Sequence, residues 1–113
     1  MYTQQQIDDI VRDLCRRLSP LFPQQRMDAI LFGSYARGNA EAGSDIDVMI
    51  LVDSSRKAIS EKNWDIGDIA GDMLLDHGVV ISPVVENREY FEKYSEMFPF
   101  YRNVRTEGVQ LRG

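Results

Sequence analysis

Apolar residues near the N-terminus recur at the spacing of an amphipathic helix. Five of them fall on one helical face: Ile7, Ile10, Val11, Leu14 and Leu18. Thr3, with Gln6 three residues later, has the pattern of a capping box and predicts where this helix begins. Pro20 and Pro23 predict its end, because proline cannot continue the hydrogen-bond ladder of a helix.

Three short apolar runs, each bounded by turn-forming residues, predict β-strands. They cover residues 27–32, 46–52 and 79–85. Pro83 lies inside the third run and lacks an N–H donor, which predicts an edge strand or a local bulge. Between the first two runs, residues 34–38 are expected to form a short helix.

A long helix is predicted between the second and third strands. Asp53, Ser54 and Ser55 have the chemistry of a turn and N-cap, and Gly78 suits the left-handed position after a helix ending near His77. The expected buried stripe of this helix is Ile59, Ile66, Ile69, Ala70, Met73 and Leu74.

The C-terminal part of the chain is rich in aromatic residues. Asn87 is expected to cap a helix that carries Tyr90, Phe91, Tyr94 and Phe98. Pro99 is expected to end that helix, and a further helical turn stopped by Gly108 and a short terminal strand are expected after it. Because so small a domain has limited core volume, part of this aromatic set predicts an exposed patch for self-association or for a partner.

The order of these elements indicates an α/β (α+β) fold with a small mixed β-sheet packed against helices. The 113 residues are enough for one hydrophobic core, so residues 1–113 are expected to form a single domain. An apolar content of 43% and a charged content of 27% are typical of soluble globular proteins.

Charge and composition exclude several classes of function. The net charge of −5 argues against a general nucleic-acid binder, whose affinity would come from a basic surface. No apolar run approaches the roughly 20 residues needed to span a membrane. Cys15 is the single cysteine, which rules out an internal disulfide and favours a reducing cytoplasm. One cysteine and one histidine also argue against a zinc site.

The most informative stretch joins the first two predicted strands. A Gly33-Ser34 pair follows the first apolar run, and Asp45 and Asp47 open the second. Side chains two residues apart on a strand point to the same face, about 6.6 Å apart, so both carboxylates can converge on a divalent ion. A Gly-Ser turn entering a helix offers backbone N–H groups to an anion. A phosphate site beside a hard-metal site suits phosphoryl or nucleotidyl transfer.

The pattern G-S-x-A-R-G followed by S-D-x-D resembles the signature of the DNA polymerase β-like nucleotidyltransferase superfamily. Within it the chain looks like the stand-alone minimal nucleotidyltransferase (MNT) domains, most strongly over residues 26–53. By resemblance, Gly33 and Ser34 contact a nucleoside triphosphate, while Asp45 and Asp47 are catalytic residues that hold one or two Mg²⁺ ions. The resemblance implies transfer of NMP, most simply AMP from ATP, onto an acceptor hydroxyl. It also implies a helical HEPN-type partner, as in MNT/HEPN toxin–antitoxin pairs.

Two further residues of this stretch are candidates for binding nucleotide. Arg37 suits a contact with the triphosphate, and an ion pair with a nearby carboxylate such as Glu41 is the alternative. Ser44 suits either capping of the loop or orientation of Asp45, and capping is favoured.

A third carboxylate is not evident in the sequence. Active members of the superfamily carry it on the strand after the long helix, where this chain has Ser82 as the polar position. Glu86 shares a face with Ser82 but lies about 13 Å further along the strand. A catalytically weak or inactive nucleotide-binding antitoxin that acts by complex formation is therefore the main alternative. A small-molecule transferase of the aminoglycoside-modifying kind is a third one.

Overall fold

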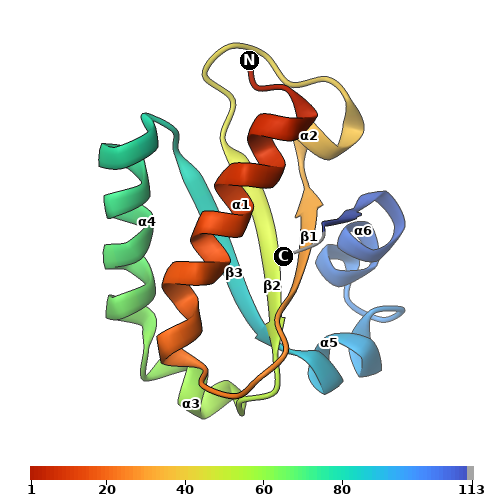
Figure 1. Cartoon of the computed structure of the whole chain (residues 1–113). Coiled ribbons are helices and arrows are strands. Elements are labelled where there is room, and N and C mark those ends of the chain that lie inside the picture. The colour runs from red at the N-terminus through yellow and green to blue at the C-terminus, as the bar shows by residue number, and fades with distance from the viewer. Residues whose placement is uncertain (112–113) are drawn as a thin grey trace.

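The computed structural model describes residues 1–111, and its helices and strands follow the predicted order (Figure 1). The elements are α1 Gln4–Leu18, a 3-10 turn η1 Ser19–Leu21, β1 Asp28–Phe32, α2 Ser34–Arg37, β2 Ile46–Val52, α3 Arg56–Ser60, α4 Asn63–His77, β3 Ile81–Asn87, α5 Arg88–Tyr94, α6 Pro99–Glu107 and β4 Val109–Leu111. Among these residues no helix combines the length and the apolar character that crossing a membrane requires.

The four strands form one mixed sheet in the order β3-β2-β1-β4. Strand β1 runs antiparallel to β2 and β4, whereas β3 runs parallel to β2. Asp47 therefore lies between two neighbours, Phe32 on β1 and Ser82 on β3. The predicted mixed sheet is confirmed, and Pro83 lies in edge strand β3 as its missing N–H donor requires.

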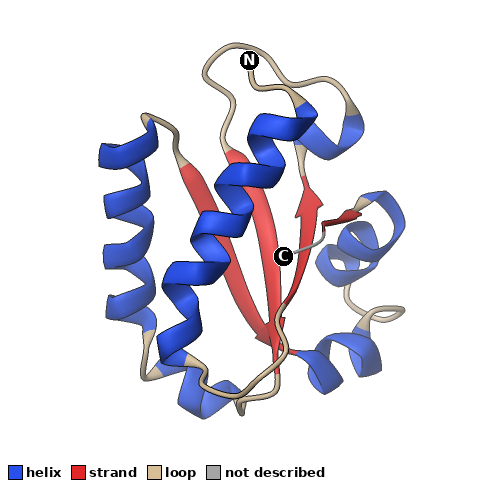
Figure 2. Ribbon diagram, in the orientation of Figure 1, coloured by secondary structure: helices blue, strands red, loops and turns tan. Residues whose placement is uncertain are grey.

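Helices cover both faces of this sheet (Figure 2). Along β2, alternate residues Val48, Ile50 and Val52 belong to the core formed with α1, α3 and α4. Met49 and Leu51 point the other way, into a second core with residues of α5 and α6. Because strand side chains alternate with period two, Asp47 is on the α5/α6 face of the sheet.

The N-terminal helix forms as its pattern predicts. The hydroxyl of Thr3 accepts from the Gln6 backbone N–H at 3.1 Å, and the Gln6 side chain accepts from the Thr3 N–H at 2.8 Å. These reciprocal bonds complete the capping box. The five apolar residues predicted for its inner face are all buried.

The predicted long helix is instead two helices. Ser55 caps the first, α3, by accepting from the Ala58 N–H at 3.1 Å, and the chain leaves helical geometry near Lys62 before α4 starts. The break lets α3 pack against β3 while α4 packs against α1 and β3. The expectation for Leu74 was wrong: it is 45% exposed, because Ile66 and Met73 supply the buried side of α4.

The aromatic segment differs from expectation in one respect. Asn87 caps α5 by accepting from the Tyr90 N–H at 2.8 Å, but α5 ends at Tyr94, so Phe98 is not part of it. Pro99 starts α6, because its fixed φ suits the first turn of a helix and its missing N–H is not needed there. The third strand starts two residues later than predicted, at Ile81.

Most of the aromatic side chains complete the second core. Phe91 and Tyr101 are buried there, with Tyr90 and Tyr94 packed against them. Phe98 and Phe100 remain 39% and 44% exposed, so the predicted exposed patch is limited to a few side chains.

Candidate active site

Gly33 occupies the turn between β1 and α2. Its φ of +76° lies in the left-handed region that side chains disfavour. A Cβ atom at this position would lie 2.3 Å from the Asp47 Oδ2 atom, which is shorter than any real contact. Glycine therefore lets the backbone of the turn approach the carboxylate that opens the neighbouring strand.

The turn leads directly into the short helix α2. Gly33 is its N-cap residue, and within the described part of the chain no side chain caps this terminus. The first N–H groups of a helix lack partners within the helix and favour an anion. The candidate phosphate-binding residues Gly33 and Ser34 are thus at a site with open backbone donors.

Asp47 carries an electrostatic cost that a cation would relieve. Burial raises the pKa of its carboxyl, the negative charge of Asp45 raises it further, and Arg37 partly opposes both. Oxygen ligands of this kind suit Mg²⁺, which commonly binds one or two carboxylates together with substrate phosphates. Across residues 1–111 no three His, Cys, Asp or Glu side chains are grouped to hold a metal by themselves. A metal here would need phosphate oxygens or a partner's ligands to complete its coordination.

The other two candidates, Arg37 and Ser44, both have partners in the structure. Arg37 lies 3.7 Å from the Glu107 carboxylate, so its partner is not Glu41 as the alternative interpretation suggested. Glu107 is the partner because α6, which carries it, packs against β1 beside the turn. The hydroxyl of Ser44 accepts from the Glu41 N–H at 2.9 Å, and the Ser44 N–H donates to the Glu41 carbonyl at 3.0 Å. This agrees with the capping role that the sequence favoured.

A hollow of about 320 Å³ lies beside the Gly33 turn and the start of β2. Gly33, Arg37 and Asp47 line one side of it, whereas Ser34, Ser44 and Asp45 are not among its lining residues. Its remaining lining residues are Phe32 from β1 and Phe100, Asn103, Val104 and Glu107 from α6. None of these α6 residues was predicted from the sequence to belong to the site. Their spacing of three, one and three marks one helical face, but nothing in the sequence places that face over Asp47.

Strand pairing places Ser82 next to Asp47. The two residues are direct partners in the parallel β2–β3 register, and neighbouring strands lie about 4.8 Å apart. Glu86, further along β3, is held elsewhere: its carboxylate accepts from the Arg56 Nε at 3.2 Å, from the Asn87 N–H at 2.8 Å and from the Tyr101 hydroxyl. It therefore cannot serve the site at Asp47.

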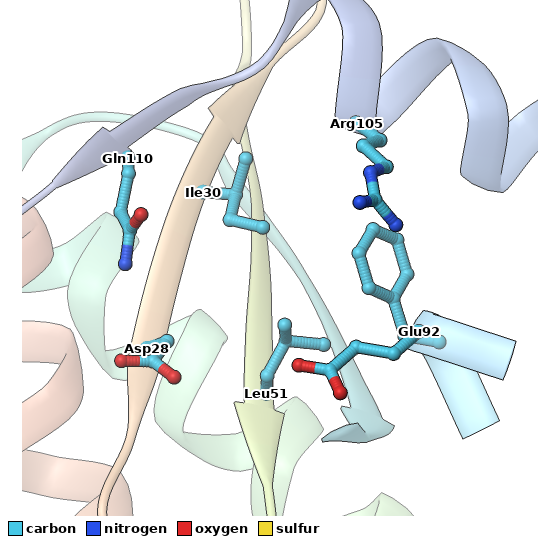
Figure 3. Close-up of a pocket in the computed structure, with 7 residues that line it drawn as sticks. Asp28, Ile30, Leu51, Glu92, Arg105 and Gln110 are labelled. Atoms are coloured by element: carbon cyan, nitrogen blue, oxygen red, sulfur yellow. The ribbon is translucent and has the colours of Figure 1, made fainter. Parts of the chain in front are cut away.

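A second hollow, of about 340 Å³, lies between β1, β4, α5 and α6 (Figure 3). Its polar wall includes Asp28, Glu92, Arg105 and Gln110. Asp28 is already neutralised by Arg88, whose guanidinium lies 3.0 Å from its carboxylate. This hollow contains neither the Gly-Ser turn nor the paired aspartates, so it is not the candidate active site.

The family assignment rests on most of the chain. The sequence profile described as "Nucleotidyltransferase domain" matches residues 7–108, which include the turn, both aspartates and α6. The chain belongs to this nucleotidyltransferase family. The predicted family, fold class and enzyme class are thereby confirmed.

A curated relative supports the same assignment for this nucleotidyltransferase. The protein named "Putative protein adenylyltransferase MJ0604", from Methanocaldococcus jannaschii, is 42% identical over 83 residues. The matched region covers 73% of this chain and 74% of the relative.

Solved structures share the fold of this nucleotidyltransferase. One chain of a toxin–antitoxin crystal structure with AMP-PNP superposes with a TM-score of 0.58 and 22% identity, covering 94% of this chain and 73% of that chain. A chain from a complex of a tri-AMPylated Shewanella oneidensis HEPN toxin with an MNT antitoxin superposes with a TM-score of 0.56 and 21% identity. The match covers 98% of this chain and 73% of that chain. At these identities the likeness shows the fold alone.

Proposed function

We propose that this nucleotidyltransferase transfers AMP from ATP to a hydroxyl of a partner protein and releases pyrophosphate. The observation that carries the proposal is that Gly33 and Asp47 line one hollow of about 320 Å³, at a turn where a Cβ on Gly33 would collide with the Asp47 carboxylate. On this proposal the turn binds phosphate and Asp47 binds metal, which is the pairing that nucleotidyl transfer requires.

Each residue of the turn and strand has a role in this proposal. The N–H groups at the start of α2 and the Ser34 hydroxyl hold the β- and γ-phosphates. Asp45 and Asp47 hold Mg²⁺, which when bound neutralises phosphate charge and polarises the oxygens of the reacting group. The Arg37 side chain is 46% exposed and its ion pair with Glu107 is long, so it can turn toward the triphosphate at small cost. Positioning and electrostatics supply most of the catalysis in such reactions.

We infer that the acceptor is a HEPN-type helical protein. Support comes from the AMPylated HEPN toxin in the structurally similar complex and from the adenylyltransferase name of the M. jannaschii relative. The net charge of −5 also favours a protein over a nucleic acid as the acceptor.

Isotope position provides a direct test of the proposed reaction. Incubation with Mg²⁺, the co-purified partner and ATP labelled at the α-phosphate is expected to label the partner, whereas γ-labelled ATP is not. This follows because AMP retains the α-phosphorus and pyrophosphate carries the γ-phosphorus away. Label transferred from γ-labelled ATP would identify a kinase and contradict the proposal.

A second candidate function is nucleotide binding without efficient transfer. It is favoured by one observation: Ser82, next to Asp47, supplies no negative charge at the strand position where active relatives are expected to carry a carboxylate. On this hypothesis the protein acts by forming a complex, and a partner carboxylate or slow chemistry limits transfer.

Replacing Ser82 by aspartate is expected to increase the rate of transfer at least tenfold. The added carboxylate would stand beside Asp47 and strengthen metal binding, and a tenfold change needs only about 1.4 kcal/mol of transition-state stabilisation. The measurement is initial rate with α-labelled ATP. Ser82→Asn is the matched control, because it has the same size as the aspartate variant without the charge. Equal rates for the two variants would show that Ser82 does not mark the missing carboxylate.

A further inference from the structure

One face of α6 forms a wall of the hollow that contains the Gly33 turn. Phe100, Asn103, Val104 and Glu107 lie on this face and line the hollow with Gly33 and Asp47. Val104 is buried, whereas Phe100 is 44% exposed and Asn103 is also exposed. The wall therefore presents an accessible aromatic ring and an accessible amide next to the carboxylate proposed to bind metal.

The chemistry of this wall does not suit phosphate. Its four α6 residues include no cation, and Glu107 adds a negative charge. It does suit a nucleoside, because aromatic side chains stack on bases and an asparagine amide offers both a donor and an acceptor to a base edge.

The position of the Phe100 ring supports the binding of a nucleoside. Phe100 packs edge-on against Phe32, with ring centroids 5.5 Å apart, so β1 holds one side of it while nearly half of its surface stays open. A ring held in this way loses little conformational freedom when a base stacks on it.

The geometry points to α6 as the nucleoside-binding element of the site. We propose that Phe100 stacks on the base of the nucleoside triphosphate and that Asn103 hydrogen-bonds to its nucleoside portion. The inference rests on the proposed function. With the β- and γ-phosphates at the Gly33 turn and the α-phosphate near Asp47, the nucleoside continues across the hollow toward α6.

The test compares two ligands that share a triphosphate but differ in the nucleoside. Binding of Mg²⁺-ATP and of Mg²⁺-tripolyphosphate is measured by calorimetry on the full chain. The wild type is expected to bind ATP at least tenfold more tightly than tripolyphosphate. Phe100→Ala is expected to weaken ATP binding about tenfold, in line with the loss of one stacked base, and to change tripolyphosphate binding less than twofold.

Further variants separate contact from folding. Asn103→Ala changes an exposed residue and is expected to weaken ATP binding several-fold without affecting tripolyphosphate. Phe100→Trp keeps a stacking surface and is expected to retain ATP affinity. Phe98→Ala, at a similarly exposed aromatic residue that does not line the hollow, is the matched control and is expected to leave both affinities unchanged.

Failure of this inference is distinguishable from failure of the proposed function. If tripolyphosphate and ATP bind to the wild type but Phe100→Ala and Asn103→Ala bind ATP normally, the α6 assignment alone is overturned. The same conclusion follows if the two alanine variants lose both ligands equally. If the wild type binds neither ligand, both the assignment and the proposed function are wrong.

Discussion

Asparagine in place of Asp47 is expected to lower nucleotidyl transfer about 1000-fold and to raise the thermal midpoint of the metal-free protein. The loss of activity follows because metal stabilisation of transition-state charge is worth several kcal/mol, and about 4 kcal/mol corresponds to 1000-fold. The gain in stability follows from burial and the nearby Asp45, which disfavour the charged form of Asp47 and raise its pKa.

The pH dependence of this gain has a defined sign. A carboxyl whose pKa is higher in the folded than in the unfolded protein loses stabilisation as the pH rises above its ordinary value, 3.8 for Asp47. The metal-free wild type is destabilised in this way when Asp47 ionises, whereas the asparagine variant has no carboxyl to ionise. The difference in thermal midpoint is therefore expected to grow as the pH rises above about 4, and to level off beyond the raised pKa.

Thermal melts with EDTA and with Mg²⁺-ATP measure both effects. Mg²⁺-ATP should raise the midpoint of the wild type by mass action, and the double variant Asp45→Asn with Asp47→Asn should lose the metal-dependent part of that shift. Asp68→Asn, at an exposed residue of α4, serves as the control. An unchanged Mg²⁺-ATP shift in the double variant would remove these residues from the metal site.

Alanine in place of Gly33 is expected to destabilise the fold by about 3 kcal/mol and to disrupt the site. At φ +76° and ψ −155° the Gly33 backbone lies in a region that is essentially restricted to glycine, which costs a residue with a side chain about 1–3 kcal/mol, and overpacking adds about 1–3 kcal/mol. Here the new Cβ would meet the Asp47 Oδ2 atom at 2.3 Å and its Cγ atom at 3.2 Å.

Gly38 offers a control glycine with a positive φ and without the close contact. Its φ of +77° is close to that of Gly33, but its ψ of 16° places it in the ordinary left-handed helical region, and no atom lies within 4 Å of its ideal Cβ position. Gly38→Ala should therefore show only the backbone cost, about 1–2 kcal/mol in denaturant unfolding. The double variant Gly33→Ala with Asp47→Ala should recover part of the loss, because the clash is removed. Equal losses for Gly33→Ala and Gly38→Ala would contradict a role for close approach to Asp47.

The sequence alone determined the local elements and the two motifs. The capping box of α1, its buried face, strand β2, the Asn87 cap and the Gly-Ser turn all depend on neighbouring residues, and each was predicted. The two-residue spacing of Asp45 and Asp47 is equally local, although only Asp47 lies within β2, which begins at Ile46. The family signature over these residues then identified the nucleotidyltransferase fold.

Only the tertiary structure decided which distant residues complete the site. The break between α3 and α4 follows from packing against β3 and α1, and no helix-breaking proline marks it in the sequence. The pairing of Asp47 with Ser82 follows from strand register, and the contact of Arg37 with Glu107 follows from the position of α6. The physical reason is that the helix and strand periods define the apolar face of each element from neighbouring residues alone. Which of these faces pack together, such as that of α6 against the sheet, is determined by burial of the second core.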